Sequence, residues 1–371
     1  MRRLKTYLYQ QKAWPKFEWD EKRVSSALAS VRLQQGRLLG QMEHLGFSLQ
    51  QEAMLMTRTQ EVLNSSAIEG ENLNLEMVRS SVARRLGIEI AGLEAVDRDV
   101  EGVVEMMLDA TERWNKPLTV TRLYDWHASL FPTTRSGMRR ITVGAWRSDE
   151  EGPMQVVSGP IGRQRVHFEA PAASRLPKEM KQFLAWFNTD NERDWVLKAA
   201  LAHLWFVTIH PFEDGNGRIG RAIADMGLAR SEQTSQRFYS MSAQIRSERQ
   251  AYYEQLERAQ RGTLNVTEWM VWFLGCLGRA IEEAQEMLHK TLAKARFWKA
   301  LSITQINERQ RGMLNRLLDD FEGNLTTTKW AKITKTSQDT ATRDIQELVA
   351  LGVLKRNEGG GRSTSYSLVL V

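Results

Sequence analysis

The segment His210–Arg221, "HPFEDGNGRIGR", gathers residue types that could act together on a phosphate group. A glycine-rich turn that opens a helix presents unpaired backbone N–H groups at the positive end of the helix dipole, and this arrangement favours phosphate. Gly215 and Gly217 would let the backbone approach an anion closely, and the side-chain amide of Asn216 could donate a hydrogen bond to it. The segment therefore indicates a binding site for a polyphosphate.

Charged residues in the same segment could supply the chemistry. Arg218 and Arg221 are three residues apart, so one helix face could carry both guanidinium groups toward phosphate oxygens. Asp214 is placed to hold Mg²⁺, whereas Glu213 is less obviously needed and is expected to face away. His210, with an ordinary pKa near ~6.5, could take a proton from a hydroxyl. The set indicates phosphotransfer or nucleotidyl transfer; the alternative, in which these residues only cap and brace helices, would not require the glycines.

The same residues resemble a known family motif. "HPFEDGNGRIGR" is similar to the Fic motif HxFx(D/E)GNGRxxR and agrees with it at every specified position, and the resemblance covers roughly residues 50–290. It implies that His210 is the general base, that Asp214 binds Mg²⁺, and that Arg218 and Arg221 contact the β- and γ-phosphates. The complete nucleotide-binding segment implied by the resemblance is Gly215, Asn216, Gly217, Arg218, Ile219, Gly220 and Arg221.

Most characterised Fic proteins are adenylyltransferases, which move AMP from MgATP to a Ser, Thr or Tyr hydroxyl of a protein. The resemblance therefore implies ATP and Mg²⁺ as cofactors and a protein as the second substrate. Transfer of another nucleotide, of phosphate or of phosphocholine stays open, because the family uses the same site in different ways.

A second motif lies upstream, in "SSAIEGE" (Ser65–Glu71). It resembles the Fic inhibitory motif (S/T)xxxE(G/N), with Ser65, Glu69 and Gly70 at the specified positions. Ser65 and Glu69 are four residues apart and share a helix face. The resemblance implies that Glu69 pairs with Arg221 in place of the γ-phosphate, so that the enzyme inhibits itself and modifies itself when released. In some relatives the same glutamate supports AMP removal, so that direction also stays open.

Two further features fit the resemblance. Residues 153–170 are expected to form a β-hairpin, with "MQVVSG" and "RVHFEA" as its arms, and to dock the protein substrate as the Fic flap does; a hairpin without a partner is the alternative. In "AYYEQLERAQ", Tyr253 is favoured over Tyr252 as the residue that stacks on the nucleotide base, although both could be core residues.

The remaining sequence predicts a mainly helical fold. Apolar residues recur at helical spacing in residues 21–47, 50–70, 78–86, 99–114, 119–131, 176–190, 195–212, 219–231, 246–262 and 266–298. We expect three segments: an N-terminal helical region at 1–95 with the inhibitory helix, a Fic core at 96–295 with the hairpin flap, and a winged helix-turn-helix at 300–371.

The C-terminal segment has the order helix, helix, helix, hairpin, which is typical of a winged helix-turn-helix. Its helices include residues 307–321 and 338–352, and its hairpin turns at Gly359–Gly361. DNA binding through residues 326–365 and a role in protein docking or dimerisation are both open. A DNA-binding regulator that senses nucleotides through the Fic core is therefore an alternative to the enzyme.

Composition limits the setting of the protein. The chain has 371 residues, a formal net charge of +6 and one cysteine, Cys276, so a disulfide within the chain is excluded and a reducing compartment is expected. The N-terminus has no apolar signal-peptide segment, and no apolar run is long enough to cross a membrane. We expect a cytoplasmic protein without a membrane partner, with a homodimer possible.

Overall fold

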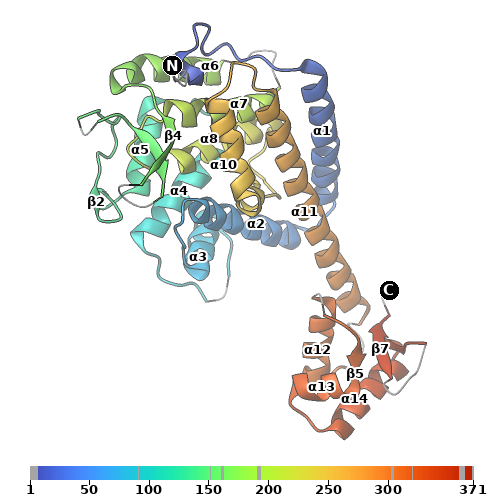
Figure 1. Cartoon of the computed structure of the whole chain (residues 1–371). Coiled ribbons are helices and arrows are strands. Elements are labelled where there is room, and N and C mark those ends of the chain that lie inside the picture. The colour runs from blue at the N-terminus through green and yellow to red at the C-terminus, as the bar shows by residue number, and fades with distance from the viewer. Residues whose placement is uncertain are drawn as a thin grey trace. The chain divides into compact units, whose positions relative to one another are not determined.

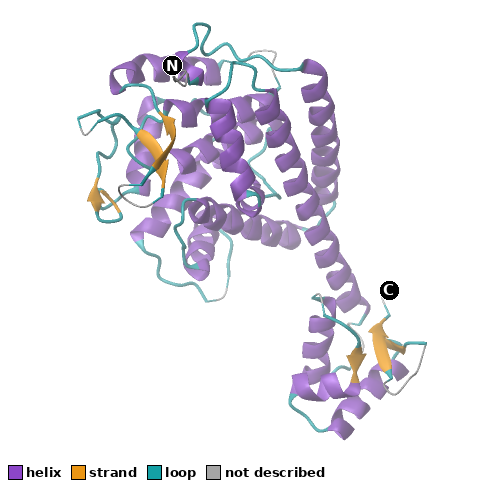
Figure 2. Ribbon diagram, in the orientation of Figure 1, coloured by secondary structure: helices purple, strands orange, loops and turns teal. Residues whose placement is uncertain are grey.

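The computed structural model describes residues 7–90, 92–150, 152–159, 163–189, 194–301, 305–319, 321–358 and 364–369. The chain divides into two compact units, Met1–Ala284 and Gln285–Val371. Figure 1 shows the course of the chain, and Figure 2 shows that helices dominate both units. The mainly helical prediction is confirmed. Among the described residues, no helix is long and apolar enough to cross a membrane.

The first unit contains most of the helices and two small hairpins. Its elements are η1 (Leu8–Gln10), α1 (Glu21–Glu43), α2 (Phe47–Ile68), α3 (Leu75–Leu86), α4 (Arg98–Glu112), α5 (Val120–Leu130), β1 (Arg135–Ser136), β2 (Arg139–Arg140), β3 (Gln155–Ser158), β4 (Arg165–Glu169), η2 (Ala173–Arg175), α6 (Leu176–Asn188), α7 (Trp195–Ile209), α8 (Asn216–Glu232), α9 (Met241–Ser247) and α10 (Arg249–Gln260), followed by α11 (Thr267–Ala300), which continues past Ala284.

Helices α7 and α8 form the centre of this unit. Every residue of α7 from Lys198 to Ile209 is buried, and the Nζ of the charged Lys198 donates to carbonyl groups at the end of α6. Glycines let α8 approach α7 closely: a Cβ at Gly227 would lie 2.9 Å from the Ala199 Cβ, and one at Gly220 would lie 2.9 Å from a Val207 methyl group. The helix before the His210–Arg221 motif and the helix that contains its second half are therefore held together by tight backbone packing.

The structure shifts one predicted helix boundary and divides one predicted helix. The apolar spacing predicts separate helices over residues 21–47 and 50–70, but α1 ends at Glu43 and α2 already begins at Phe47, because Gly46 adopts extended backbone angles as the residue before α2. The predicted helix over 246–262 breaks at Glu248, whose φ of −107° and ψ of 25° interrupt the helical path between α9 and α10. Periodicity alone does not reveal such breaks, since the apolar spacing continues across them.

The predicted hairpin is present as β3 and β4. The strands are antiparallel, with Gln155 opposite Glu169 and Ser158 opposite Arg165, and a bulge follows Val156. Residues 160–162 at its tip lie outside the described residues. A second, shorter hairpin, β1 and β2, is not predicted by the sequence pattern; its signal is the Ser136-Gly137 pair, in which Gly137 takes a φ of +56°.

The second unit has its own hydrophobic core around Trp330, Leu314 and Leu348. After α11 come α12 (Glu308–Leu318), β5 (Leu325–Thr326), α13 (Thr327–Thr334), α14 (Gln338–Ala350), β6 (Leu354–Arg356) and β7 (Ser365–Leu368). The sheet order is β5-β7-β6, so the expected hairpin gains a third strand that the sequence pattern does not predict. The winged helix-turn-helix is confirmed; the expected turn at Gly359–Gly361 lies outside the described residues.

Candidate active site

His210 ends α7 in an unusual backbone conformation. Its φ of 52° is left-handed, and its N–H donates to the Phe206 carbonyl as the last bond of the helix. The ring Nδ1 lies 3.2 Å from the Val207 carbonyl oxygen. A carbonyl can only accept, so Nδ1 carries the proton and Nε2 keeps its lone pair. Burial lowers the pKa of His210 to about 4, which leaves the ring neutral and able to accept a proton at neutral pH.

Asn216 holds the loop that follows His210. Its Oδ1 accepts from the Phe212 N–H at 3.0 Å, and its Nδ2 donates to the Phe212 carbonyl at 2.8 Å. The side chain is buried, and one N–H of its amide ties the loop to α8, so donation to a phosphate by the second N–H stays a prediction. The backbone N–H groups of the first turn of α8 remain without intrahelical partners, as at any helix start.

Gly215 is the residue before α8 and takes a φ of +79°. A Cβ at this position would lie 2.9 Å from the Phe131 ring and be strained by the left-handed backbone. Ile219 is fully buried, and Gly220 faces α7, so these two residues of the predicted nucleotide segment hold the helix in place rather than facing outwards. Within Gly215–Arg221, Gly217 in the first turn of α8 is the partly exposed residue.

Asp214 is held from two directions. Its Oδ1 accepts from the Gly215 N–H at 2.6 Å, and its Oδ2 accepts from the Ser136 hydroxyl on β1. Its backbone carbonyl accepts from Nε2 of His127 at 3.2 Å, while Nδ1 of His127 accepts from the Gly144 N–H at 3.2 Å. His127 and Ser136 therefore position Asp214, and sequence reasoning missed both.

His127 is fixed as a neutral ring. Because Nδ1 accepts, the proton must sit on Nε2, and burial lowers the pKa of this histidine to about 4. The ring stacks on Phe212 with 4.1 Å between centroids and 8° between planes. In the sequence His127 is one polar residue in an amphipathic helix, and nothing in its spacing connects it with residue 214.

The fit of Asp214 to Mg²⁺ follows from its surroundings. Among the described residues, no group of three or more His, Cys, Asp or Glu side chains could enclose a metal ion. Magnesium in phosphate-binding sites is held by one or two carboxylates and by the phosphates themselves, so a single carboxylate suffices. Each carboxylate oxygen of Asp214 accepts one hydrogen bond and keeps a further lone pair, so the residue fits this role. Glu213 faces Arg139 and the Thr142 N–H instead.

Arg221 contacts the end of α2, as expected. Its Nε donates to the Ser65 hydroxyl at 3.0 Å, its Nη2 donates to the Ser65 carbonyl at 2.7 Å, and its Nη1 lies 2.8 Å from Oε1 of Glu69. The last contact is an ion pair whose N–H is not aimed at the oxygen. The same carboxylate lies against Gly217, where an added Cβ would meet Oε1 at 2.0 Å. Glu69 therefore lies on the first turn of α8, where a phosphate would bind.

Arg218 does not join Arg221 on a common target. Its Nη1 lies 2.5 Å from Oε2 of Glu71, and its guanidinium lies over the Phe131 ring at 5.1 Å from the centroid. Three-residue spacing brings the two arginines near each other, but each pairs with a different carboxylate. Glu71 is not among the predicted site residues, although it stands two positions after Glu69.

The two tyrosines of α10 differ in the way that is expected of adjacent helix positions. Tyr252 is fully buried, and its hydroxyl lies 2.9 Å from Nε2 of His203. Tyr253 is 39% exposed, and its hydroxyl donates to the Ile68 carbonyl at 3.3 Å. Tyr253 is thus the tyrosine beside the end of α2, whereas Tyr252 belongs to the core.

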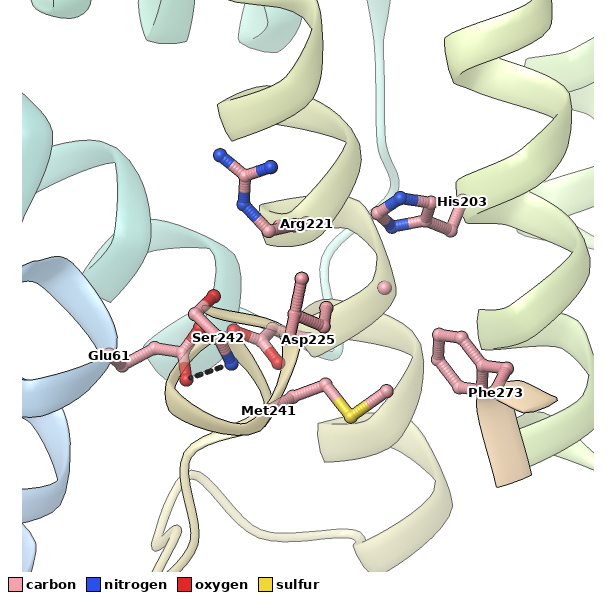
Figure 3. Close-up of a pocket in the computed structure, with 9 residues that line it drawn as sticks. Glu61, His203, Arg221, Asp225, Met241, Ser242 and Phe273 are labelled. Atoms are coloured by element: carbon pink, nitrogen blue, oxygen red, sulfur yellow. Dashed lines mark hydrogen bonds between the residues drawn. The ribbon is translucent and has the colours of Figure 1, made fainter. Parts of the chain in front are cut away.

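A buried polar cluster lies behind Arg221 (Figure 3). It lines a small pocket with residues of α2, α7, α8, α9 and α11: Glu61, His203, Arg221, Ala224, Asp225, Met241, Ser242, Ile245 and Phe273. Glu61 of α2 accepts from the Ser242 N–H at 3.1 Å and from the Ser240 hydroxyl at 2.6 Å. Burial, and then the nearby Glu61 carboxylate, raise the pKa of Asp225, whose Oδ1 pairs with Arg237 at 2.5 Å. The cluster anchors α2 beside α8.

The β3–β4 hairpin is tied to the same site. Arg147 donates from Nε to the His210 carbonyl at 2.8 Å and from Nη2 to the Pro171 carbonyl, just after β4, at 2.5 Å. Arg261, after α10, donates to the Val166 and His167 carbonyls of β4, each at 2.6 Å. The outer side of β4 is therefore braced, while β3 has β4 as its sole strand partner among the described residues.

The fold and the site together define a helical domain in which a neutral histidine precedes a glycine-rich helix start. Residues 117–228 match the model of the Fic/DOC family, and this part of the chain is a Fic domain, as the motif predicts. Residues 309–366 match a DeoR-like helix-turn-helix domain, and residues 7–88 match a domain of unknown function, DUF4172.

Curated relatives are similar over part of their length. The chain is 26% identical over 234 residues to a protein adenylyltransferase Fic of Nematostella vectensis, covering 60% of this chain and 48% of the relative. It is 29% identical over 101 residues to a probable protein adenylyltransferase of Aquifex aeolicus, covering 27% of this chain and 29% of the relative. The chain thus spans less than half the length of these relatives.

A solved structure agrees with the fold. The crystal structure of a Fic family protein from Desulfovibrio desulfuricans is similar, with a TM-score of 0.56 and 22% identity, over 95% of this chain and 97% of that one. At this identity the likeness concerns the fold.

Proposed function

We propose that this protein is a Mg²⁺-dependent protein adenylyltransferase that is inhibited by its own Glu69. One observation carries the proposal: the Glu69 carboxylate lies against Gly217 and 2.8 Å from Arg221, at the helix start where a nucleotide phosphate would bind. A carboxylate at that place supports an anion site there. The neutral Nε2 of His210 supplies the base that transfer to a hydroxyl needs.

In the proposed reaction, the hydroxyl oxygen of the target forms a bond to the α-phosphorus of ATP. The bond from that phosphorus to the bridging oxygen of the pyrophosphate breaks, and the hydroxyl proton passes to Nε2 of His210. The backbone N–H groups of the first turn of α8 stabilise the charge on the phosphate oxygens. Asp214 would hold Mg²⁺, which neutralises charge on the leaving pyrophosphate when it is bound.

Inhibition follows from competition for Arg221. While Glu69 pairs with this arginine, the last phosphate of ATP lacks its cation and meets a like charge. The nucleotide could then bind only in a pose that does not direct its α-phosphorus to the target hydroxyl. Removal of the carboxylate would free Arg221 and permit transfer, including transfer to the protein itself.

The β3–β4 hairpin is the proposed docking element for the protein substrate. An extended peptide could pair with the open edge of β3, because main-chain groups on an unpaired edge are ready to form a ladder. Arg147 links the hairpin to the backbone of His210. The hydroxyl of a peptide docked on β3 would therefore be positioned relative to the His210 ring.

The proposal is tested by incubating Glu69→Gly protein with MgATP and measuring its mass. We expect one or more added AMP groups, formed at least about ten times faster than in the parent, and a loss of about 10²–10⁴-fold when His210→Ala is added, as for removal of a general base. Glu52→Ala, at an exposed position of the same helix, is the matched control and should behave as the parent. An unmodified Glu69→Gly protein would contradict the proposal.

Two other functions remain open. AMP removal would use the same site, with Glu69 positioning a water, and would be detected as release of AMP by the parent protein from an adenylylated target.

DNA binding by the second unit is supported by its match to a DeoR-like helix-turn-helix domain. Such binding would make the Fic domain a nucleotide-responsive part of a regulator. A homodimer and a cytoplasmic location stay predictions.

A further inference from the structure

Two carboxylate side chains, those of Glu69 and Glu71, extend from the end of α2 toward α8. The helix stops at Ile68, Gly70 takes a left-handed φ of +89°, and the chain turns back on itself. The Gly70 N–H donates to the Ala67 carbonyl at 3.1 Å, and the Glu71 N–H donates to the Ser66 carbonyl at 3.1 Å. These two bonds form a Schellman motif, which holds the backbone of Glu69 and Glu71 in a defined position on either side of the glycine.

Each carboxylate pairs with one arginine of α8. Glu69 lies 2.8 Å from Arg221, and Glu71 lies 2.5 Å from Arg218. Both arginine side chains are almost fully buried, at 2% and 3% exposure, whereas the two glutamates are 31% and 46% exposed. The cations are thus fixed in the site, and the anions reach them from the solvent side.

The hydrogen bonds of the arginines are incomplete. Nε of Arg218 is buried and has no hydrogen-bond acceptor among the described residues, and the buried Nη1 of Arg221 has only the ion pair with Glu69. Unsatisfied buried donors are unfavourable, and phosphate oxygens are strong acceptors for guanidinium groups. Burial raises the pKa of Glu71 despite the opposing attraction of Arg218, as expected for a carboxylate that is held in a partly desolvated place. Both sites could therefore exchange a carboxylate for a phosphate.

We propose that Glu71 is a specificity-determining residue, which sets with Glu69 how many phosphates the nucleotide site accepts. The inference rests on the proposed function, in which Arg218 receives the β-phosphate and Arg221 the γ-phosphate. A nucleoside monophosphate needs neither arginine and binds with both carboxylates in place. To place its phosphates on these arginines, as the productive pose requires, a diphosphate must displace Glu71, and a triphosphate must displace both Glu71 and Glu69.

The test is equilibrium binding of AMP, ADP and ATP, with Mg²⁺ present, measured by titration calorimetry on the full chain. Glu71→Gln should raise affinity for ADP and ATP by about three- to fivefold, the size of a partly exposed ion pair, and leave AMP unchanged. Glu69→Gln should raise affinity for ATP and leave ADP unchanged. Glu76→Gln, an exposed glutamate of the next helix, is the control and should change none of the three.

The outcomes separate the inference from the function on which it rests. If Glu71→Gln binds ADP no better than the parent while Glu69→Gln binds ATP more tightly, the inference is wrong and the proposed function stands. If a double variant that combines Glu69→Gln with Glu71→Gln binds none of the three nucleotides, the proposed function fails as well. Addition of Arg218→Ala to Glu71→Gln should abolish the gain for ADP; a gain that persists would also overturn the inference.

Discussion

At the scale of single residues, the site depends on histidines held neutral by their surroundings. Nδ1 of His210 faces a carbonyl oxygen, which can only accept, so Nδ1 carries the proton. Nδ1 of His127 faces a backbone N–H, which can only donate, so the proton is on Nε2. His203, behind Arg221, is fully desolvated, and burial lowers its pKa to about 3. Neutral rings avoid placing further positive charge beside Arg218 and Arg221.

The titration of His210 tests this arrangement. A pH titration of its ring signals by NMR, assigned with His210→Gln, should give a pKa near the lowered value of about 4 rather than the ordinary ~6.5. The unfolded chain takes up this proton first as pH falls. The contribution of the neutral His210 ring to the stability of the folded state is therefore complete above pH ~6.5, and it is lost as pH falls toward the pKa of the folded state, about 4. A midpoint at pH ~6.5 would show that the His210 ring is solvated and is not kept neutral by burial.

At the scale of elements, close packing of helices sets the position of the site. Gly102 of α4 lies against α5, and a Cβ there would lie 1.7 Å from the Ser129 carbonyl oxygen. The obstacle is backbone, which cannot rotate away as a side chain can. Helix α5 carries His127, so the same contact also positions the carbonyl group of Asp214.

Replacement of Gly102 by alanine should therefore destabilise the first unit by at least about 3 kcal/mol, as expected for severe overpacking. Gly36 of α1 is the matched control, since a Cβ there would meet nothing within 4 Å. Gly36→Ala should stabilise by about 0.5–1 kcal/mol through the helix preference of alanine. Urea unfolding followed by tryptophan fluorescence gives both values. Similar effects of the two changes would show that the α4–α5 contact is looser than the structure indicates.

At the scale of the whole molecule, the chain combines a Fic domain with a second unit that has its own core and sheet. The described surface of the second unit carries basic side chains on α13, on α14, between these two helices and on β6: Lys329, Lys332, Lys335, Arg343, Lys355 and Arg356. In a helix-turn-helix the second helix enters the major groove, and basic residues around it contact phosphates. DNA binding by this unit stays a prediction that these residues make testable.

A gel-shift titration with duplex DNA at increasing salt tests that role. Affinity should fall linearly on a log–log plot against salt, and Arg343→Ala on α14 should reduce the slope by about one phosphate contact. Lys178→Ala, an exposed lysine of the first unit, should leave the slope unchanged. Absence of any shift at low salt would favour a docking or dimerisation role for this unit.

The sequence alone determined the features that depend on neighbours along the chain. The twelve residues His210–Arg221 lie in one loop and one helix, so their types and spacing are enough to indicate a base, a metal ligand and an anion site. Helical periodicity predicts the mainly helical fold, although it misses the break at Glu248 and misplaces the boundary between α1 and α2 near Gly46. The Fic resemblance also predicts the pairing of Glu69 with Arg221.

The tertiary structure decided which side chains meet across elements. Glu71 and Arg218 are 147 positions apart, and Ser136 lies 78 positions before Asp214, so no local spacing relates them. Sequence periodicity specifies the face of an element on which a residue lies, but the group opposite that face is set by how the elements pack.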